Sequence, residues 1–593
     1  MNDIGNKVLK GGEFVIKETL WKDNFIPEDI SDEQKLIRES VKNFVETEIK
    51  LHGGKLDQQE RLLLEAANLG LLSSHVSSEY GGSELDTYTN TVILEEFGKG
   101  DASFNTSLAA HTGIGMLPIY YFASEEIKKK YLPGLCNGTL KASYCLTEPG
   151  SGSDALSAKT TATLNSAGTH YIISGQKMWI SNAGFADVLI VFGQIDGDKF
   201  TGFLVERNSP GISMGEEEHK LGIKGSSTRQ VFFENVAVPK ENLLGELGKG
   251  HLIAFNVLNI GRFKLGCMAM GGCKSSIEAG IKYANQRIQF NQKISEFGAI
   301  QYKIAESIIR TYATESAVYR VSDLLEDKFK EELHTHSKAF LALQKAAEEY
   351  SIECAIIKVY GSDTLDYVVD ELVQIHGGYG YSEEYIPSKL YRDARINRIY
   401  EGTNEINRLL IVNMLIRRTL KGLIDLVGPA WEVQKELTGL PDTSIPDEKF
   451  GLELRTLRDF KKMSLMVAGA AVKYQMDGKH DLKDQQEILM NIADMLIDLF
   501  VSESVLLRVQ KLSSTANEID LKEEIAILQV QFHDAQYRIA KAATDALASF
   551  ASGDELKIML LGIKRFSRYP VINVVKNRKI IAHKAIEENR YCY

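Results

Sequence analysis

Apolar residues recur at helical spacing near the start of the chain and along most of its second half. In residues 31–50 they stand three and four positions apart, and Ser31 with Gln34 makes a capping box at the first turn. This period predicts helices in both regions. The other segments with the same period are 57–67, 90–97, 114–131, 251–420 with short breaks, 450–476, 482–512 and 521–550.

Between residues 143 and 238 the pattern changes to short runs of β-branched and aromatic residues, bounded by Gly, Asn and Asp. Runs of this length and composition are typical of strands. We therefore expect a compact β domain between two helical regions. Its strands are predicted at 170–174, 177–180, 188–192, 200–205 and 230–233.

This order of elements predicts a mainly α fold with a central β domain. We expect an N-terminal helical domain, a β-barrel-like middle domain and a C-terminal helical bundle, followed by an appended helical domain. Residues 437–446 hold two of the chain's 11 prolines, which makes this segment the best candidate for a linker. The predicted boundaries are 1–30 for an N-terminal segment, 31–142, 143–245 and 246–425 for the three domains, 426–447 for the linker and 448–593 for the appended domain.

The composition, with 44% hydrophobic and 25% charged residues, is that of a soluble globular protein. A net charge of −11 gives no support to general binding of nucleic acid. The six cysteines form no CxxC pair and indicate free thiols in a reducing compartment. The first residues lack a signal or transit pattern and no apolar run reaches about 18 residues, so we expect a cytoplasmic protein without a membrane span. The histidines show no ligand spacing, and we predict no metal site.

One carboxylate stands at a hinge ahead of a predicted helix. In Tyr400-Glu401-Gly402-Thr403, Glu401 lies beside a glycine, and Thr403 is suited to cap the helix that follows. A carboxylate there can face a cleft close to the N–H groups of the helix start, which suits proton abstraction next to a carbonyl. Alone, an acidic residue beside a glycine is usually a simple turn.

Two segments of the β domain offer contacts to a planar or phosphorylated ligand. The run 144–154 contains glycines that let a ligand approach the backbone, and Thr147 and Ser153 add hydroxyls. In the second segment Trp179 is suited to stack on an aromatic cofactor, with Ser181 beside it as a donor. The alternatives are a structural Gly/Ser loop and a tryptophan of the β core.

Two segments of the helical region offer contacts to phosphates. Arg287 stands between two predicted helices, where its fork of donors suits a pyrophosphate. Gly377 and Gly378 follow an apolar helix and would admit a phosphate or an adenosine against the backbone. The alternative for Arg287 is a solvated residue at a helix end, and His376 is more often a packed or capping histidine than a catalyst.

Taken together and in this order, these motifs resemble the acyl-CoA dehydrogenase family. The resemblance covers residues 31 to 418 and implies the fold of that family, with the helical extension appended to it. The motifs that carry it are Tyr144-Cys145-Leu146-Thr147-Glu148-Pro149-Gly150-Ser151-Gly152-Ser153-Asp154, Trp179-Ile180-Ser181-Asn182, Arg287 with Phe290, Gln374 with Gly377-Gly378, and Tyr400-Glu401-Gly402-Thr403.

The resemblance implies FAD bound between the β domain and the C-terminal helices of a homodimer. The residues that would hold the isoalloxazine and nearby groups are Tyr144, Leu146, Thr147, Gly152, Ser153, Trp179 and Ser181. Thr403 and Glu405 also fall on flavin-contacting positions, although relatives often carry Gln in place of Glu405. The residues that would meet the FAD of the neighbouring subunit are Arg287, Phe290, Gln374, Gly377 and Gly378.

Glu401 matches the catalytic base of the family. It would remove the α-proton of an acyl-CoA thioester while the β-hydrogen leaves as hydride to flavin N5, giving a trans-2-enoyl-CoA. In the family an FAD ribityl hydroxyl and the N–H of the base stabilise the enolate-like charge. We expect burial beside flavin and acyl chain to raise the pKa of Glu401 toward working pH.

Some members place the base on the helix that here carries Gly261, so Glu401 is the single candidate in this chain. Arg262 follows the family pattern and would support Glu401 and the substrate pocket. The residues expected to bind substrate are Thr106, Ala110, Ser153, Asn259, Arg262 and Gly402.

The helical extension after the core is similar to that of the very-long-chain acyl-CoA dehydrogenases. Small residues at 106–110 stand where medium-chain relatives carry larger polar ones, so we expect long-chain fatty acyl-CoA as the substrate, in fatty acid β-oxidation. The resemblance implies that an electron-transfer flavoprotein takes the electrons. An acyl-CoA oxidase or related flavin monooxygenase, and a scaffold that acts in complex assembly, are the alternatives.

Basic residues gather near the C-terminus of this acidic chain, at 564–568 and 576–581. Basic segments with apolar flanks can lie on an anionic lipid surface, so we expect peripheral membrane contact there. The alternative is a solvated helix face.

Overall fold

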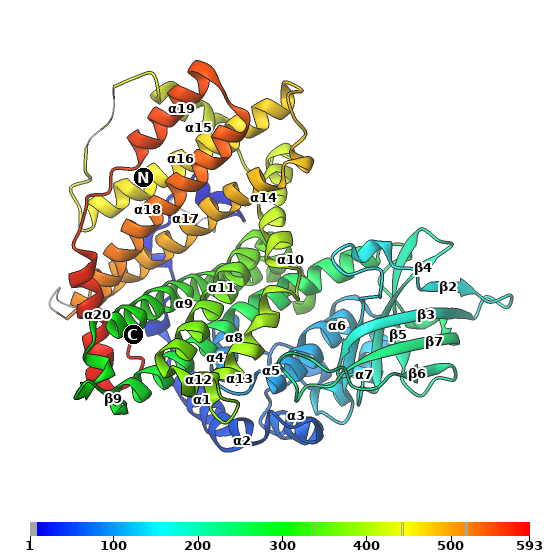
Figure 1. Ribbon diagram of the computed structural model, residues 1–593. Helices are drawn as coiled ribbons and strands as arrows, with labels where there is room; N and C mark the ends of the chain where they lie inside the picture. Colours follow the sequence, from blue (N-terminus) through cyan, green and yellow to red (C-terminus); the bar gives the residue numbers. More distant parts are fainter. Residues whose placement is uncertain (1–8, 337, 441, 443, 516–519) are drawn as a thin grey trace.

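The computed structural model describes residues 9–593 apart from 337, 441, 443 and 516–519. A helical body occupies the middle of the molecule, with the β domain at one end and a bundle of C-terminal helices along another side (Figure 1). The order helical, β, helical and appended helical confirms the predicted fold class. Residues 1–8 of the predicted N-terminal segment lie outside the described residues.

The N-terminal domain consists of helices whose starts follow capping side chains. The predicted capping box is present, because the Ser31 hydroxyl accepts from the Gln34 N–H while Gln34 Oε1 accepts from the Ser31 N–H. The single helix predicted over 114–131 is wrong, since Ala123 is extended and Ser124 caps a new helix. The elements are α1 Asp32–Phe44, α2 Lys50–His52, α3 Gln59–Asn68, α4 Thr87–Gly98, α5 Ala102–Ala109, the π-helical turn η7 Ala110–Gly115, α6 Leu117–Phe122 and α7 Glu125–Cys136.

One sheet forms the middle domain, in the strand order β6-β7-β3-β2-β4-β5-β8, with β1 parallel to β4. The runs predicted at 170–174 and 177–180 belong to one strand, β3, whose pairing with β7 is irregular at two places. Trp179 lies at the second irregularity with a positive φ of 59°, and its side chain stays 54% exposed. The strands are β1 Ala142–Cys145, β2 Thr161–Leu164, β3 His170–Ser181, β4 Val188–Ile195, β5 Lys199–Glu206, β6 Ile212–Met214, β7 Thr228–Pro239 and β8 Leu243–Leu244.

Helix α8 runs through the centre of the C-terminal bundle and packs against α4, α9 and α11. Among the described helices, α8 alone has the length and apolar composition that a membrane span needs, and 67% of its most apolar window is buried within the protein. Such burial is typical of a helix that is apolar on all sides at the centre of a bundle. The elements are α8 Gly250–Gln286, the hairpin β9 Ile288–Gln289 and β10 Gln292–Lys293, α9 Gly298–Leu333, α10 Ala339–Glu349, α11 Ser351–His376, α12 Gly378–Tyr381, α13 Ile386–Ala394 and α14 Asn404–Leu420.

The appended domain is a second helical bundle. The helices predicted at 450–476, 482–512 and 521–550 are confirmed as α16 to α18, whereas two further helices, α19 and α20, were not predicted. The range 426–447, predicted as a linker, is helical in its first half, where α15 lies. The helices are α15 Val427–Glu436, α16 Gly451–Met476, α17 Gln486–Leu512, α18 Lys522–Phe550, α19 Gly553–Phe566 and α20 Val574–Glu588.

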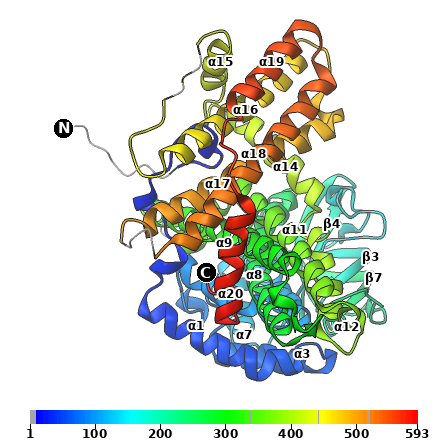
Figure 2. The same cartoon turned by 60° about the vertical axis from the view of Figure 1, so that its left-hand side comes forward.

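Buried ion pairs join the appended domain to the bundle. Figure 2 shows α20 crossing in front of α9. Arg320 of α9 contacts Glu503 of α17 at 2.8 Å, and both side chains are almost fully buried. Arg578 of α20 contacts Glu306 of α9 at 2.5 Å. Arg565 donates to the Gly439 carbonyl at 2.6 Å, so part of the basic C-terminal stretch faces the protein rather than the solvent.

Candidate active site

The turn before α14 has an unusual backbone. Glu401 and Gly402 both take left-handed conformations, with φ of 58° and 81°. Thr403 then caps α14, since its hydroxyl accepts from the Ile406 N–H at 3.2 Å, which confirms the predicted cap. A left-handed glutamate is sparsely populated, and such residues gather at functional sites where the surroundings hold them.

Side chains from three helices hold this turn. Lys358 of α11 donates to the Gly402 carbonyl at 2.7 Å. Asn407 of α14 donates to the carbonyls of Gly402 at 2.8 Å and Thr403 at 3.0 Å. Arg262 of α8 donates to the Glu401 carbonyl at 3.3 Å. The turn is therefore fixed on its carbonyl side.

The carboxylate of Glu401 lies directly over Gly261. A Cβ atom at position 261 would stand 2.5 Å from Glu401 Oε2, closer than any side chain allows. That oxygen is buried, and no hydrogen-bond partner for it occurs in the described part of the chain. Burial raises the pKa of Glu401 from 4.5 to about 7, although Arg262, Lys358 and Lys264 each act to lower it. The carboxyl group is thus poised to change its charge near neutral pH.

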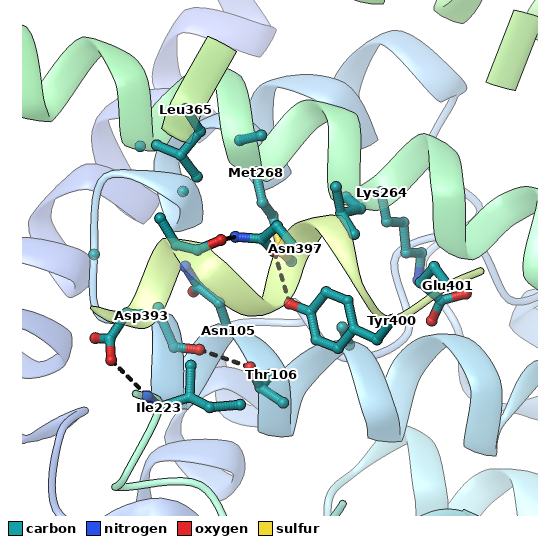
Figure 3. A pocket seen from close by; sticks show the side chains of 18 of the residues that line it. Asn105, Thr106, Ile223, Lys264, Met268, Leu365, Asp393, Asn397, Tyr400 and Glu401 are labelled. Atoms are coloured by element: carbon teal, nitrogen blue, oxygen red, sulfur yellow. Dashed lines mark hydrogen bonds between the residues drawn. The ribbon is translucent and has the colours of Figure 1, made fainter. Parts of the chain in front are cut away.

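A largely apolar pocket opens beside Glu401 and follows one face of α8, and we call it the α8 pocket. Its α8 wall runs from Gly261 to Ser276 through small or flexible side chains, including Met268. Figure 3 shows Glu401, Tyr400 and Lys264 at one end of the view and Leu365 at the other. The further lining residues include Gly98, Asn105, Thr106, Ala109, Ala110, Ser181, Leu265, Ala269, Gly272, Leu365 and Val369.

Two of the six predicted substrate residues line this pocket. Thr106 and Ala110 line it from α5 and η7. Arg262 lies behind the turn and donates to Asn259 at 2.7 Å. Ser153 instead lies on an exposed loop of the β domain. Gly402 forms the turn itself.

Of the flavin contacts predicted in the β domain, Ser181 lines the pocket, at the end of β3. Tyr144 is buried on β1, and its hydroxyl has no hydrogen-bond partner among the described residues. Trp179 presents half of its surface to solvent. Among the remaining predicted contacts, Leu146 is buried, and the Thr147 carbonyl accepts from the Met178 N–H. Gly152 is exposed, and so is Glu405, which lies on α14.

The other predicted cofactor residues lie at the far end of α8, in a surface groove that we call the hairpin groove. Arg287, Phe290, Gly377 and Gly378 line it. Phe290 is 89% exposed, and a Cβ on either glycine would meet only open space. Gln374 is exposed one turn before Gly378, near the end of α11. Because α8 rises about 1.5 Å per residue, Arg287 stands about 39 Å from Gly261. One chain therefore does not bring the residues of the hairpin groove close to those around Glu401.

Three functional neighbours of Glu401 were missed from sequence. Lys358 and Asn407 lie in helical segments where a polar residue is ordinarily solvated, and only the packed fold turns them onto the Glu401 turn. Lys264 did carry a signal, because it is a lone charge within the apolar run from Phe263 to Gly272. In the described residues, no group of three or more His, Cys, Asp or Glu side chains is placed to hold a metal ion.

Models of acyl-CoA dehydrogenase domains match most of the chain. The N-terminal-domain model matches residues 31–139 and the middle-domain model residues 143–236. Two models of C-terminal domains match residues 248–416 and, in the appended domain, residues 459–565.

Proteins of this kind resemble the chain over nearly its whole length. A probable acyl-CoA dehydrogenase of Bacillus subtilis (strain 168) is 44% identical over 590 residues, 98% of each chain. The human mitochondrial very long-chain specific acyl-CoA dehydrogenase is 35% identical over 477 residues, 75% of this chain and 68% of that protein. A crystal structure of an acyl-CoA dehydrogenase complexed with FAD from Bacillus anthracis is 45% identical with a TM-score of 0.95, over 99% of this chain and 100% of that one. The chain belongs to the acyl-CoA dehydrogenase family.

Proposed function

We propose that this protein oxidises long-chain acyl-CoA thioesters to trans-2-enoyl-CoA with FAD, in fatty acid β-oxidation, and that Glu401 takes the α-proton. One observation carries the proposal: a buried carboxylate whose pKa is raised to about 7 faces a long apolar pocket. An acyl chain fits such a pocket, and a base with this pKa is half ionised at neutral pH.

Residues of the β domain fit FAD. The Tyr144 hydroxyl is a buried polar group without a partner in the described chain, and a polar edge of an isoalloxazine would supply one. Trp179 offers an exposed aromatic face. Gly150 and Gly152 leave open space where a cofactor can approach the backbone. When bound, FAD supplies the oxidant that takes the β-hydrogen with its electron pair.

The chain's own residues perform the proton transfer and hold the thioester. Glu401 removes the α-proton through an oxygen that no described residue engages. The Glu401 N–H donates to no described acceptor, which leaves it free to stabilise negative charge on the thioester oxygen. Lys358 and Arg262 hold the carbonyls of the turn, so the N–H and the carboxylate keep their relative orientation.

The length of the α8 pocket supports a long-chain substrate. From Gly261 to Ser276 its α8 wall spans about 22 Å, at a rise of about 1.5 Å per residue. An extended alkyl chain advances roughly 1.25 Å per carbon, given carbon–carbon bonds of about 1.5 Å. A wall of this length corresponds to an extended chain of roughly 18 carbons.

The hairpin groove supports a homodimer. Its residues lie too far from Glu401 to reach the same cofactor, so we propose that they bind the FAD of a second copy. Arg287 would pair with phosphate oxygens there. An electron-transfer flavoprotein is the proposed acceptor, in the cytoplasm.

We also propose peripheral membrane contact through α19. Its outer face exposes Ile558 and Leu561 between Lys557 and Lys564, a pattern that suits an anionic lipid surface. Co-sedimentation with anionic vesicles tests this. Binding that is unchanged in a variant with Ile558 and Leu561 replaced by Asp would remove this part of the proposal.

The reaction is tested by anaerobic titration of the purified flavoprotein with palmitoyl-CoA and, separately, with butyryl-CoA. Bleaching of the flavin absorbance by palmitoyl-CoA supports both the reaction and the chain length. Bleaching by butyryl-CoA alone would refute the chain length. Peroxide formed in air at the turnover rate would favour an oxidase, and a preparation that cannot be loaded with flavin would favour the scaffold role.

A further inference from the structure

Lys264 is a buried charge that the proposed reaction does not use. It lies one turn along α8 from Gly261, is 8% exposed, and lines the α8 pocket beside Glu401. Figure 3 shows its amino group directed toward the end of the pocket where Glu401 lies. A lysine in an apolar pocket loses hydration, which disfavours its charge. An interaction with an opposite charge would compensate for this loss.

The contacts of Lys264 are weak compared with those of its cationic neighbours. Its ammonium donates to the Thr112 carbonyl and hydroxyl, both at 3.3 Å. It forms no ion pair with a described carboxylate. Lys358 and Arg262, in contrast, each donate a hydrogen bond to a carbonyl of the Glu401 turn. Lys264 is therefore the cation near Glu401 whose charge can be removed without taking a bond from the turn.

The charged and titratable groups that face Glu401 come from four directions. From α8 come Arg262 and Lys264, from α11 comes Lys358, from β1 comes the Tyr144 hydroxyl, and Tyr400 precedes Glu401 itself. The two tyrosines carry no charge at neutral pH, because burial raises the pKa of each. The three cations thus determine how far the carboxylate is stabilised.

His75 is a further titratable group near Lys264. Its Nε2 is buried and has no hydrogen-bond partner among the described residues. Burial lowers the pKa of His75, as does the nearby Lys264, so the ring is neutral. Burial also lowers the pKa of Lys264, to about 8, while Glu401 acts to raise it. At neutral pH the positive charge therefore resides on Lys264.

We propose that Lys264 is a positioning residue whose ammonium keeps the Glu401 carboxylate ionised when an acyl chain fills the α8 pocket. This inference rests on the proposed role of Glu401 as the base. An incoming chain expels water from the pocket, which disfavours the charged carboxylate. The same loss of water strengthens the attraction between the two charges, so Lys264 acts most strongly when the base must be ready.

The test removes the charge in two ways and measures the carboxyl group itself. Lys264→Met keeps most of the stem, while Lys264→Gln also keeps donors for Thr112. The Glu401 carboxyl is titrated by NMR in FAD-loaded protein labelled with δ-¹³C glutamate, and its signal is assigned by its loss in Glu401→Gln. Both variants are expected to raise the Glu401 midpoint by about one pH unit, the effect of an opposite charge nearby. The acid limb of kcat/KM should move alkaline by the same amount.

Two control variants separate charge from packing. Lys264→Arg keeps the charge and should keep the wild-type midpoint, and Thr112→Val removes one contact of Lys264 without removing the charge. An unchanged Glu401 midpoint in both neutral variants would overturn the inference, leaving Lys264 as a support for η7. The inference would also fall if both neutral variants fail to fold while Lys264→Arg folds. Full activity of Glu401→Gln would instead defeat the proposed function, so the two failures are distinguishable.

Discussion

The sites at the two ends of α8 differ in how far a single chain encloses them. At the Gly261 end, helices α8, α11 and α14 fix the Glu401 turn, and the carboxylate is enclosed. At the Arg287 end, Phe290 is exposed, and Arg287 lies 5.5 Å from the ring centre of Tyr379. A single chain thus encloses the Glu401 end of α8, whereas the hairpin groove at the Arg287 end stays open to solvent.

The largest effect is expected from Glu401→Gln, which removes the proposed base but keeps the shape of the enclosed end. We expect kcat/KM with palmitoyl-CoA to fall by about 10³-fold or more, since general-base catalysis contributes up to about 10⁴-fold. FAD content should be unchanged, because the substitution is isosteric. Stopped-flow flavin reduction measures the step. A loss of less than about tenfold would mean that the base lies elsewhere.

The next effect is expected from Gly261→Val. A side chain at 261 would occupy the space of the Glu401 carboxylate, which lies 2.5 Å from the site of a Cβ atom. The carboxylate must then move away from the substrate, and a misplacement of about 1 Å costs roughly 10²-fold. Steady-state turnover measures this, and the melting temperature reports whether the fold survives. Wild-type turnover in a folded variant would contradict the placement of Glu401.

Gly272→Leu is expected to shorten the α8 pocket. A Cβ at this position would stand 3.2 Å from Leu365 Cδ1, within the wall of the pocket. We expect kcat/KM for palmitoyl-CoA to fall roughly tenfold to a hundredfold, the scale of a steric mismatch in an apolar pocket. The rate with butyryl-CoA in the same variant is the internal control. Equal losses for both substrates would show that the chain does not reach Gly272.

Arg287→Ala tests the hairpin groove, at the Arg287 end of α8. Loss of a charged hydrogen bond to phosphate is expected to weaken FAD retention roughly tenfold. The kcat at saturating FAD should stay close to wild type, because Glu401 is distant. Lys293→Ala, on the same hairpin, is the matched control. Unchanged retention of FAD in Arg287→Ala, measured by dialysis, would remove the groove from the cofactor site.

The last prediction concerns the pH dependence of the wild-type protein. Glu401 acts as a base only when ionised, and burial raises its pKa from 4.5 to about 7. The value of kcat/KM should therefore be full above that pH and fall about tenfold for each unit below it. A pH–rate profile of the wild-type protein measures the midpoint. A midpoint near 4.5 would show that the carboxylate is solvated in the working enzyme.

The sequence predicted those parts of the site that depend on local pattern. The Thr403 cap, the turn at Glu401 and the capping box at Ser31 follow from residues next to one another. The sequence did not predict the contact of Lys358 with the Glu401 turn, because a lysine in a helix is ordinarily solvated. Only the packing of α11 against α14 brings this side chain to the turn.

The parts of the fold that were missed have similar physical causes. Ser124 is an N-cap within an apolar run, so the run contains two helices where its periodicity predicts one. Helices α19 and α20 carry the basic residues for which the sequence indicates membrane contact or a solvated helix face. Arg578 instead forms ion pairs with Glu306 and Asp534, so the charge is part of a contact.

The appended domain is fastened to the rest of the molecule by side chains as well as by the peptide connection. Leu440, between α15 and α16, is 95% exposed, so a protease can reach the chain at this residue. A cut there would leave the contact between Arg320 and Glu503 in place. The nicked protein should run as two bands on a denaturing gel yet elute as one particle from a sizing column. The same position is a tolerant point for inserting an affinity tag.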